Sequence, residues 1–76
     1  MEKIKGNEIF WQSNNKNVSV CYSQFDLGAK YKVYRKVFYT LDDGTLRKCW
    51  EFLISFSHFG EAVSYAKRDN DLKIIR

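Results

Sequence analysis

The pattern of apolar and polar residues along the chain predicts β-structure first and a helix last. Apolar and polar positions alternate from residue 17 to residue 23, which places Val18, Val20 and Tyr22 on one side of a strand with one buried face. A short apolar run at 8–12 precedes this strand, and the polar cluster SNNKN between the two is typical of a turn. We therefore expect two neighbouring strands at the start of the chain.

Two longer alternating runs, about 31–41 and 45–56, flank the dipeptide Asp43-Gly44. Asp-Gly between alternating runs is a strong hairpin signal, because both positions of a two-residue turn need a positive φ. We favour that turn because it separates apolar from polar side chains better than a three-residue turn with Gly44 in a bulge. The favoured register places these residues on the core side of the hairpin: Tyr31, Val33, Val37, Leu41, Leu46, Trp50, Phe52, Ile54 and Phe56. The bulged register would instead set Trp50, Phe52 and Ile54 opposite Lys36, Tyr34 and Lys32.

The apolar period changes from two to 3.6 after residue 56, which predicts a helix. Phe59, Ala62, Val63 and Ala66 form one apolar stripe over about ten residues, and Asn70 is a suitable left-handed stop. The final LKIIR is expected to add a short edge strand. The predicted fold class is α+β: a small antiparallel β-sheet of about three to five strands with one C-terminal helix packed on one face. Residues 1–76 form a single compact domain in this prediction.

Composition supports a folded chain in spite of its short length. The 76 residues are 45% hydrophobic and 17% aromatic, and aromatic side chains bury the most area per residue in a thin core. The chain shows no apolar run of signal-peptide length and none of the roughly 18 residues that a membrane span needs, so we expect a cytoplasmic protein without a membrane partner. Cys21 and Cys49 are then expected to be reduced thiols within strands.

Candidate catalytic residues are few, and each has a structural explanation. His58, the single histidine, falls at the start of the predicted helix, and Asp42-Asp43 falls in the predicted turn. One histidine and two distant cysteines do not supply the paired ligands of a metal site, and the sequence contains no glycine-rich phosphate loop. We therefore predict a protein that is not an enzyme and has no metal or cofactor.

Charge points to a binding surface on the hairpin. The net charge is +4, and residues 30–48 alone hold six basic and two acidic residues. If the helix covers one face of the sheet, the other face presents aromatic and basic residues, which can stack on bases and neutralise phosphates. The predicted nucleic-acid-binding residues are Lys32, Tyr34, Lys36, Phe38 and Arg47. The pattern does not distinguish DNA from RNA or a single strand from a duplex, whose major groove also admits a two-stranded ribbon.

Protein binding is the alternative function. Tyr34 and Phe38 also suit a strand for purely structural reasons, and a second protomer could cover the same face in a homodimer. In size and composition the chain resembles small inhibitors and adaptors, including those of mobile elements and phages, which act through a sheet face or a sheet edge. The net positive charge argues against an acidic mimic of DNA.

Overall fold

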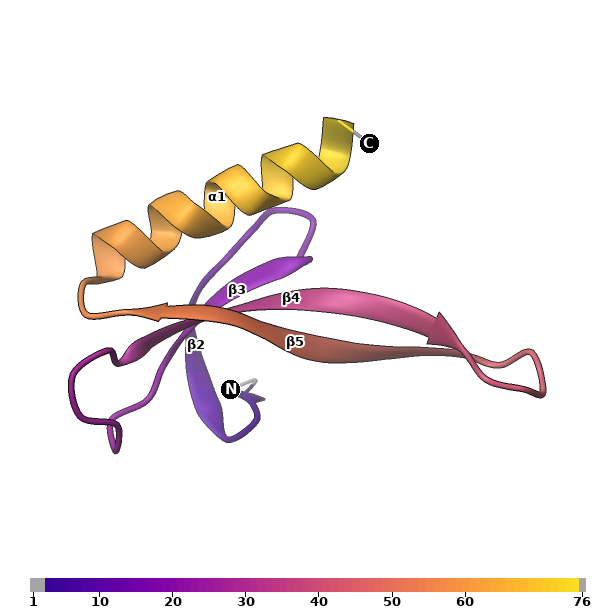
Figure 1. The fold of residues 1–76 in the computed structure, drawn as a ribbon, viewed down its shortest axis with the longest axis horizontal. Coiled ribbons are helices and arrows are strands. Elements are labelled where there is room, and N and C mark those ends of the chain that lie inside the picture. Colours follow the sequence, from indigo (N-terminus) through magenta and orange to yellow (C-terminus); the bar gives the residue numbers. More distant parts are fainter. Residues whose placement is uncertain (1–2, 76) are drawn as a thin grey trace.

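The computed structural model describes the backbone of residues 3–75 and the side chains of residues 3–70. Within that part of the chain it contains five strands followed by one helix (Figure 1): β1 Lys3–Ile4, β2 Asn7–Gln12, β3 Val18–Tyr22, β4 Tyr31–Thr40, β5 Leu46–Phe56 and α1 Phe59–Ile75. The strands form one antiparallel sheet in chain order, and α1 packs across β3 and β4. This confirms the predicted α+β fold with a C-terminal helix on one face of the sheet. Among the described residues, no helix combines the length and apolar character that crossing a membrane requires.

The main core lies between α1 and the sheet, on what we call the helix face. Val18, Val20 and Val33 are fully buried there against Ala62 and Ala66 of the helix. The two alanines belong to the predicted apolar stripe, and their small side chains let the helix backbone approach the sheet closely. A rim of partly buried residues surrounds this core: Trp11, Tyr31, Leu53, Phe56, Val63 and Tyr65.

The opposite face of the sheet, the open face, holds a second and smaller cluster. Ile4 of β1, Cys21 of β3 and Tyr34 of β4 are buried together, with Ile9 and Trp50 packed against them. Neighbouring strands lie about 4.8 Å apart, so Ile4 and Tyr34 can meet only because the sheet curls and brings β1 over the open face. Figure 1 shows β2 on the side of the sheet away from α1. The prediction that β3 buries a single face is therefore wrong, since its residues 18–21 are buried on both faces.

The end of the chain departs from the prediction. Asn70 does not stop the helix: it has no positive φ, and α1 continues to Ile75. Its side-chain oxygen accepts a hydrogen bond from Asn15 Nδ2 at 3.0 Å. Residues after Gly60 include no glycine or proline, so no residue breaks the helical hydrogen bonds. The expected edge strand LKIIR is consequently wrong for residues 72–75, and Arg76 lies outside the described residues.

The hairpin between β4 and β5 has the three-residue turn, and the favoured two-residue turn is wrong. Leu41 N donates to Thr45 O at 2.9 Å, and Gly44 N donates to Leu41 O at 2.9 Å, which closes a loop of Asp42, Asp43 and Gly44. Only Gly44 has a positive φ in this loop, at +87°, whereas a two-residue turn would need a positive φ at Asp43 as well. Asp43 Oδ1 instead accepts a hydrogen bond from Thr45 N at 2.9 Å, which stabilises the longer turn.

The changed register moves several side chains from the predicted core to the open face. Trp50 lies opposite Lys36, and Phe52 lies opposite Tyr34. A bulge at Leu53 then shifts the pairing by one residue, so that Val33 pairs with Ile54 as expected. The predicted core face therefore holds where the hairpin packs under α1, at Tyr31, Val33 and Phe56, and fails on the other side of the bulge, at Leu46, Trp50 and Phe52.

Candidate nucleic-acid interface

The hairpin extends beyond the rest of the sheet as a two-stranded ribbon. The pairing of β3 with β4 ends at Val18 and Arg35. One further hydrogen bond, from Lys36 N to Asn17 O at 2.7 Å, joins β4 to the residue that precedes β3. Residues 36–50 continue with each other as their only strand partners among the described residues, and we call this segment the arm. In Figure 1 the arm projects to the right, away from β2, and lies along the 41 Å long axis of the molecule.

Three cross-strand pairs of the arm each join a basic residue to an aromatic residue: Lys36 with Trp50, Phe38 with Lys48, and Tyr39 with Arg47. Side chains alternate between the two faces of a strand, so the first two pairs share the open face with Tyr34 and the third lies on the other face. Phe38 is 57% exposed and Tyr39 is 48% exposed, so both faces of the ribbon present an accessible ring.

Four of these residues, Lys36, Phe38, Lys48 and Trp50, form a small patch that we call the arm quartet. Lys36 and Phe38 follow each other along β4, and Trp50 and Lys48 stand opposite them on β5, so that basic and aromatic side chains alternate along both strands and across them. Lys36 Nζ lies 5.3 Å from the centre of the Trp50 ring, within the range of a cation–π contact.

Two of the predicted binding residues are occupied within the protein. Tyr34 is only 3% exposed, its ring meets Phe52 edge-on at 5.8 Å, and Lys5 Nζ lies 5.7 Å from its centre. A base has no access to this ring. Lys32 Nζ lies 2.6 Å from Asp26 Oδ2, a contact that raises the pKa of the Lys32 ammonium and lowers the pKa of the Asp26 carboxyl. Tyr34 and Lys32 therefore already have partners within the protein: Phe52 and Lys5 for Tyr34, and Asp26 for Lys32.

The other three predicted residues belong to the arm but not to one face. Lys36 and Phe38 lie in the arm quartet, whereas Arg47 pairs with Tyr39 on the reverse side. The prediction omitted Lys48 and Trp50 because it used the two-residue turn. The three-residue turn, which the sequence also allowed, would have placed Lys48 opposite Phe38 and revealed the quartet.

Ion pairs fix the base of the arm to the helix. Arg35 Nη2 donates to Glu51 Oε1 at 2.6 Å, and Arg35 Nη1 donates to Asp69 Oδ1 of α1 at 3.3 Å. Glu51 and then Asp69 favour the charged guanidinium and raise its pKa. Because two carboxylates already neutralise Arg35, we assign it to positioning the arm and not to contacting a phosphate.

The tip of the arm and the helix start contain the residues considered for catalysis. The Thr45 amide that donates to Asp43 lowers the pKa of this carboxyl, so the turn alone accounts for its position. His58 is exposed just before α1, and its carbonyl oxygen accepts a hydrogen bond from Ala62 N at 3.2 Å. The carboxylates of Asp42 and Asp43 make the tip negative and unfavourable for a phosphate, in contrast to the part of the arm nearer the sheet, where the quartet lies.

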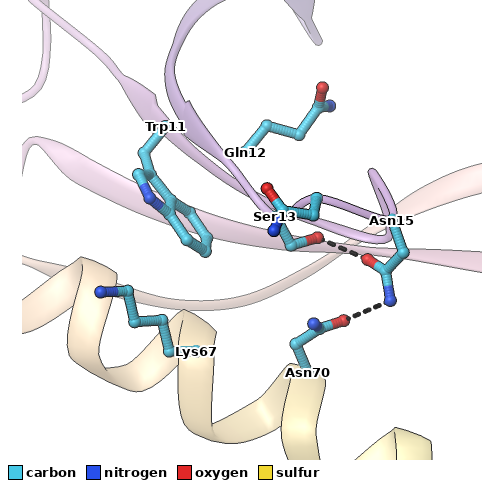
Figure 2. A pocket seen from close by; sticks show the side chains of 7 residues that line it. Trp11, Gln12, Ser13, Asn15, Lys67 and Asn70 are labelled. Atoms are coloured by element: carbon cyan, nitrogen blue, oxygen red, sulfur yellow. Dashed lines mark hydrogen bonds between the residues drawn. The ribbon is translucent and has the colours of Figure 1, made fainter.

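A pocket of about 510 Å³ lies elsewhere, between the β2–β3 turn and α1 (Figure 2). Its lining includes Trp11, Gln12, Ser13, Asn15, Lys67 and Asn70. Ser13 Oγ donates to Asn15 Oδ1 at 2.7 Å, and Asn15 in turn donates to Asn70 at 3.0 Å. Ser13 Oγ also accepts the amide of Val18 at 3.1 Å. These bonds join the turn to the helix, so we assign the polar groups of this pocket a structural role.

The arm is thus the part of the described chain in which basic and aromatic side chains meet in an ordered and accessible arrangement. Its function has to be inferred from this geometry and its chemistry. Comparison of the chain with models of protein families, with curated proteins and with solved structures found no match.

Proposed function

We propose that this chain is a small non-enzymatic protein that binds nucleic acid through the arm. The observation that carries the proposal is the set of three cross-strand pairs, each of which joins a basic to an aromatic residue. Lysine and arginine can neutralise phosphates, while aromatic rings can stack on bases, and a strand of nucleic acid presents both groups at short intervals.

The arm quartet suits an unpaired strand. Phe38 and Trp50 present rings on one face, and stacking on a base requires that the base is not already stacked within a duplex. Lys36 and Lys48 alternate with these rings and would meet the phosphates between successive bases. Arg47 on the reverse face would add a further contact to the phosphate backbone of the nucleic acid. We therefore propose that single strands bind more tightly than duplexes.

The test is a titration of fluorescently labelled single-stranded and double-stranded oligonucleotides, in DNA and RNA forms, at about 50 mM and about 200 mM salt. We expect the single strands to bind more tightly and their affinity to fall steeply with salt. Lys48→Gln should reduce the slope of log affinity against log salt by about 0.7, the value for one phosphate contact with a single strand. The matched control is Lys67→Gln on α1, which should leave the slope unchanged. Equal slopes for wild type and Lys48→Gln would contradict the assigned role.

A second candidate, binding of a protein partner as an inhibitor or adaptor, is supported by the loop between β3 and β4. Phe25 is 87% exposed and Leu27 is 98% exposed, and large apolar side chains so open to solvent are typical of contact surfaces. The double variant Phe25→Ser and Leu27→Ser tests whether this loop and the arm are separate surfaces. If the arm binds nucleic acid, the variant keeps the affinity of wild type for oligonucleotides, and a loss of that affinity would assign the loop to the same site.

A further inference from the structure

The outer edge of β5 is a long row of main-chain groups that no strand of the described chain covers. β5 is the last strand in the sheet order and has 11 residues. Natural proteins usually shorten such an edge or interrupt it with proline or a bulge, because it can pair with a further strand. β5 contains no proline, and its one bulge lies at Leu53, close to its C-terminal end.

The hydrogen bonds of the turn show which residues of β5 face outward. Leu41 donates to Thr45, and hydrogen-bonded and non-hydrogen-bonded pairs then alternate along an antiparallel ladder. Arg47, Cys49 and Glu51 therefore bond to β4, while the main-chain groups of the residues between them point to the open edge. The regular edge runs from 46 to 52, where the bulge ends it, and its midpoint is Cys49.

We propose that a second copy of this chain pairs with this edge, in an antiparallel and two-fold symmetric arrangement centred on Cys49. This inference does not depend on the function of the arm. The pairing opposes Arg47 to Glu51 of the second copy, and Lys48 to Trp50 of the second copy. It also opposes Leu46 to Phe52 of the second copy. Each charged residue thus meets an opposite charge or an aromatic ring, and the two apolar residues meet each other.

The alternative symmetric registers are poorer in each case. Centring the pair on Lys48 would oppose two lysines, and centring it on Glu51 would oppose two glutamates, which is unfavourable for charges directly across from each other. A centre at Trp50 would leave Arg47 opposite Leu53, in the bulge. Registers centred between two residues would set an outward-facing residue of one copy opposite an inward-facing residue of the other, so their main-chain groups could not bond. The edge is therefore self-complementary in one register, as a two-fold interface requires.

Glu51 can accept this additional partner. Arg35 bonds to its Oε1, and the side chain remains 49% exposed. Its second oxygen can receive the guanidinium of Arg47 from the second copy, in a network of three charged groups. In the dimer, Trp50 lies beside Lys48 of the second copy, so the two arm quartets form one continuous face across the two-fold axis.

Sedimentation of the reduced protein tests the dimer. We expect wild type to have twice the mass of one chain, and the single variants Arg47→Glu and Glu51→Arg each to weaken the dimer on the order of tenfold or more. An equimolar mixture of the two variants should dimerise again, because position 47 of each chain then meets an opposite charge at position 51 of the other. A monomeric wild type at about 100 µM, above the Kd of ordinary specific contacts, would overturn the proposal. A mixture no tighter than its components would also overturn it.

Cross-linking through Cys49 supplies a second measurement that does not depend on the folding of the charge variants. Two residues opposite each other in a non-hydrogen-bonded pair have Cα atoms about 4.5 Å apart, within disulfide range. Diamide should take two electrons and two protons from two Cys49 thiols and join the chains. The control is the double variant Cys49→Ser and Ser64→Cys, which moves the thiol to an exposed position on α1. The proposal expects rapid cross-linking of wild type alone, and equal rates for the two proteins would contradict it.

Discussion

The ammonium group of Lys36 lies 5.3 Å from the centre of the Trp50 ring, and the two residues face each other across the β4–β5 hairpin. At a partly open surface such a contact contributes about 0.5–1 kcal/mol. It also depends on the three-residue turn, because a two-residue turn would place Val37 opposite Trp50. The same pair thus reports the register of the arm and joins a charge suited to a phosphate with a ring suited to a base.

Replacing Trp50 separates its structural role from its proposed binding role. Trp50 is half-buried against a small cluster, so Trp50→Ala should lower the free energy of unfolding by about 1–3 kcal/mol, less than a fully buried tryptophan would. Oligonucleotide affinity should fall by about 1–3 kcal/mol if the ring stacks on a base. Trp11→Ala is the matched control, because Trp11 is also half-buried but packs on the helix face. Thermal melting and titration of both variants check this, and equal affinity losses would contradict the assignment.

Tyr34 and Phe38 lie on the same face of the same strand and should behave differently. Tyr34→Ala removes a side chain that is 3% exposed and should cost about 3–5 kcal/mol of stability, enough to unfold so small a domain. Phe38→Ala removes a ring that is 57% exposed and should change stability by no more than about 0.5 kcal/mol. Urea unfolding curves measure both. Comparable losses would mean that a partner strand or a second copy covers Phe38.

The turn can be tested through its glycine. Gly44 has a φ of +87°, which side chains other than glycine rarely adopt, so Gly44→Ala should destabilise the fold by about 1–2 kcal/mol. Gly60 lies in α1 with no atom within 4 Å of an added Cβ and without a positive φ. Gly60→Ala should therefore stabilise the fold by about 0.5 kcal/mol. Melting temperatures that shift in the same direction for both variants would contradict this description of the turn.

The layered fold could be predicted because the residues that face the helix recur at regular intervals. Val18 and Val20 recur at every second position of β3, and Ala62 and Ala66 recur at the helical period, so these residues indicated the helix face correctly even though β3 is buried on its other face as well. The curl of the sheet could not be predicted in this way. β1 has two residues, too few for any period, and it is β1 that brings Ile4 against Tyr34.

The register of the arm could not be predicted from the apolar pattern. Residues 38–49 are exposed on both faces of the ribbon, so no burial selects one face and apolar residues occur on both. The choice depends on whether Asp43 adopts a positive φ, and its side-chain bond to Thr45 N favours the longer turn. Lys36 and Phe38 could be placed on one face because they belong to the same strand. The face on which Lys48 and Trp50 lie relative to them depends on how β5 pairs with β4, and the predicted pairing was off by one residue.

The two cysteines are free thiols and should react at very different rates. Cys21 is buried, and burial raises the pKa of its thiol to about 12, so the reactive thiolate is nearly absent at neutral pH. Cys49 is exposed. Dilute native protein should therefore show one fast thiol with a chromogenic disulfide reagent, and the second thiol only after unfolding. Adding a reductant should leave the melting temperature unchanged. Two fast thiols in the native protein would contradict the burial of Cys21 with Ile4 and Tyr34 on the open face.

The fluorescence of Trp50 tests most directly whether the arm binds nucleic acid. The chain has two tryptophans, so Trp11→Phe leaves Trp50 as the single reporter, and the phenylalanine can still pack on the helix face. This variant should be titrated at about 50 mM salt with an unlabelled single-stranded oligonucleotide, and salt should then be added. If bases stack on Trp50, its emission falls in a saturable manner and recovers as salt weakens the phosphate contacts. An emission that stays constant throughout the titration would contradict nucleic-acid binding by the arm.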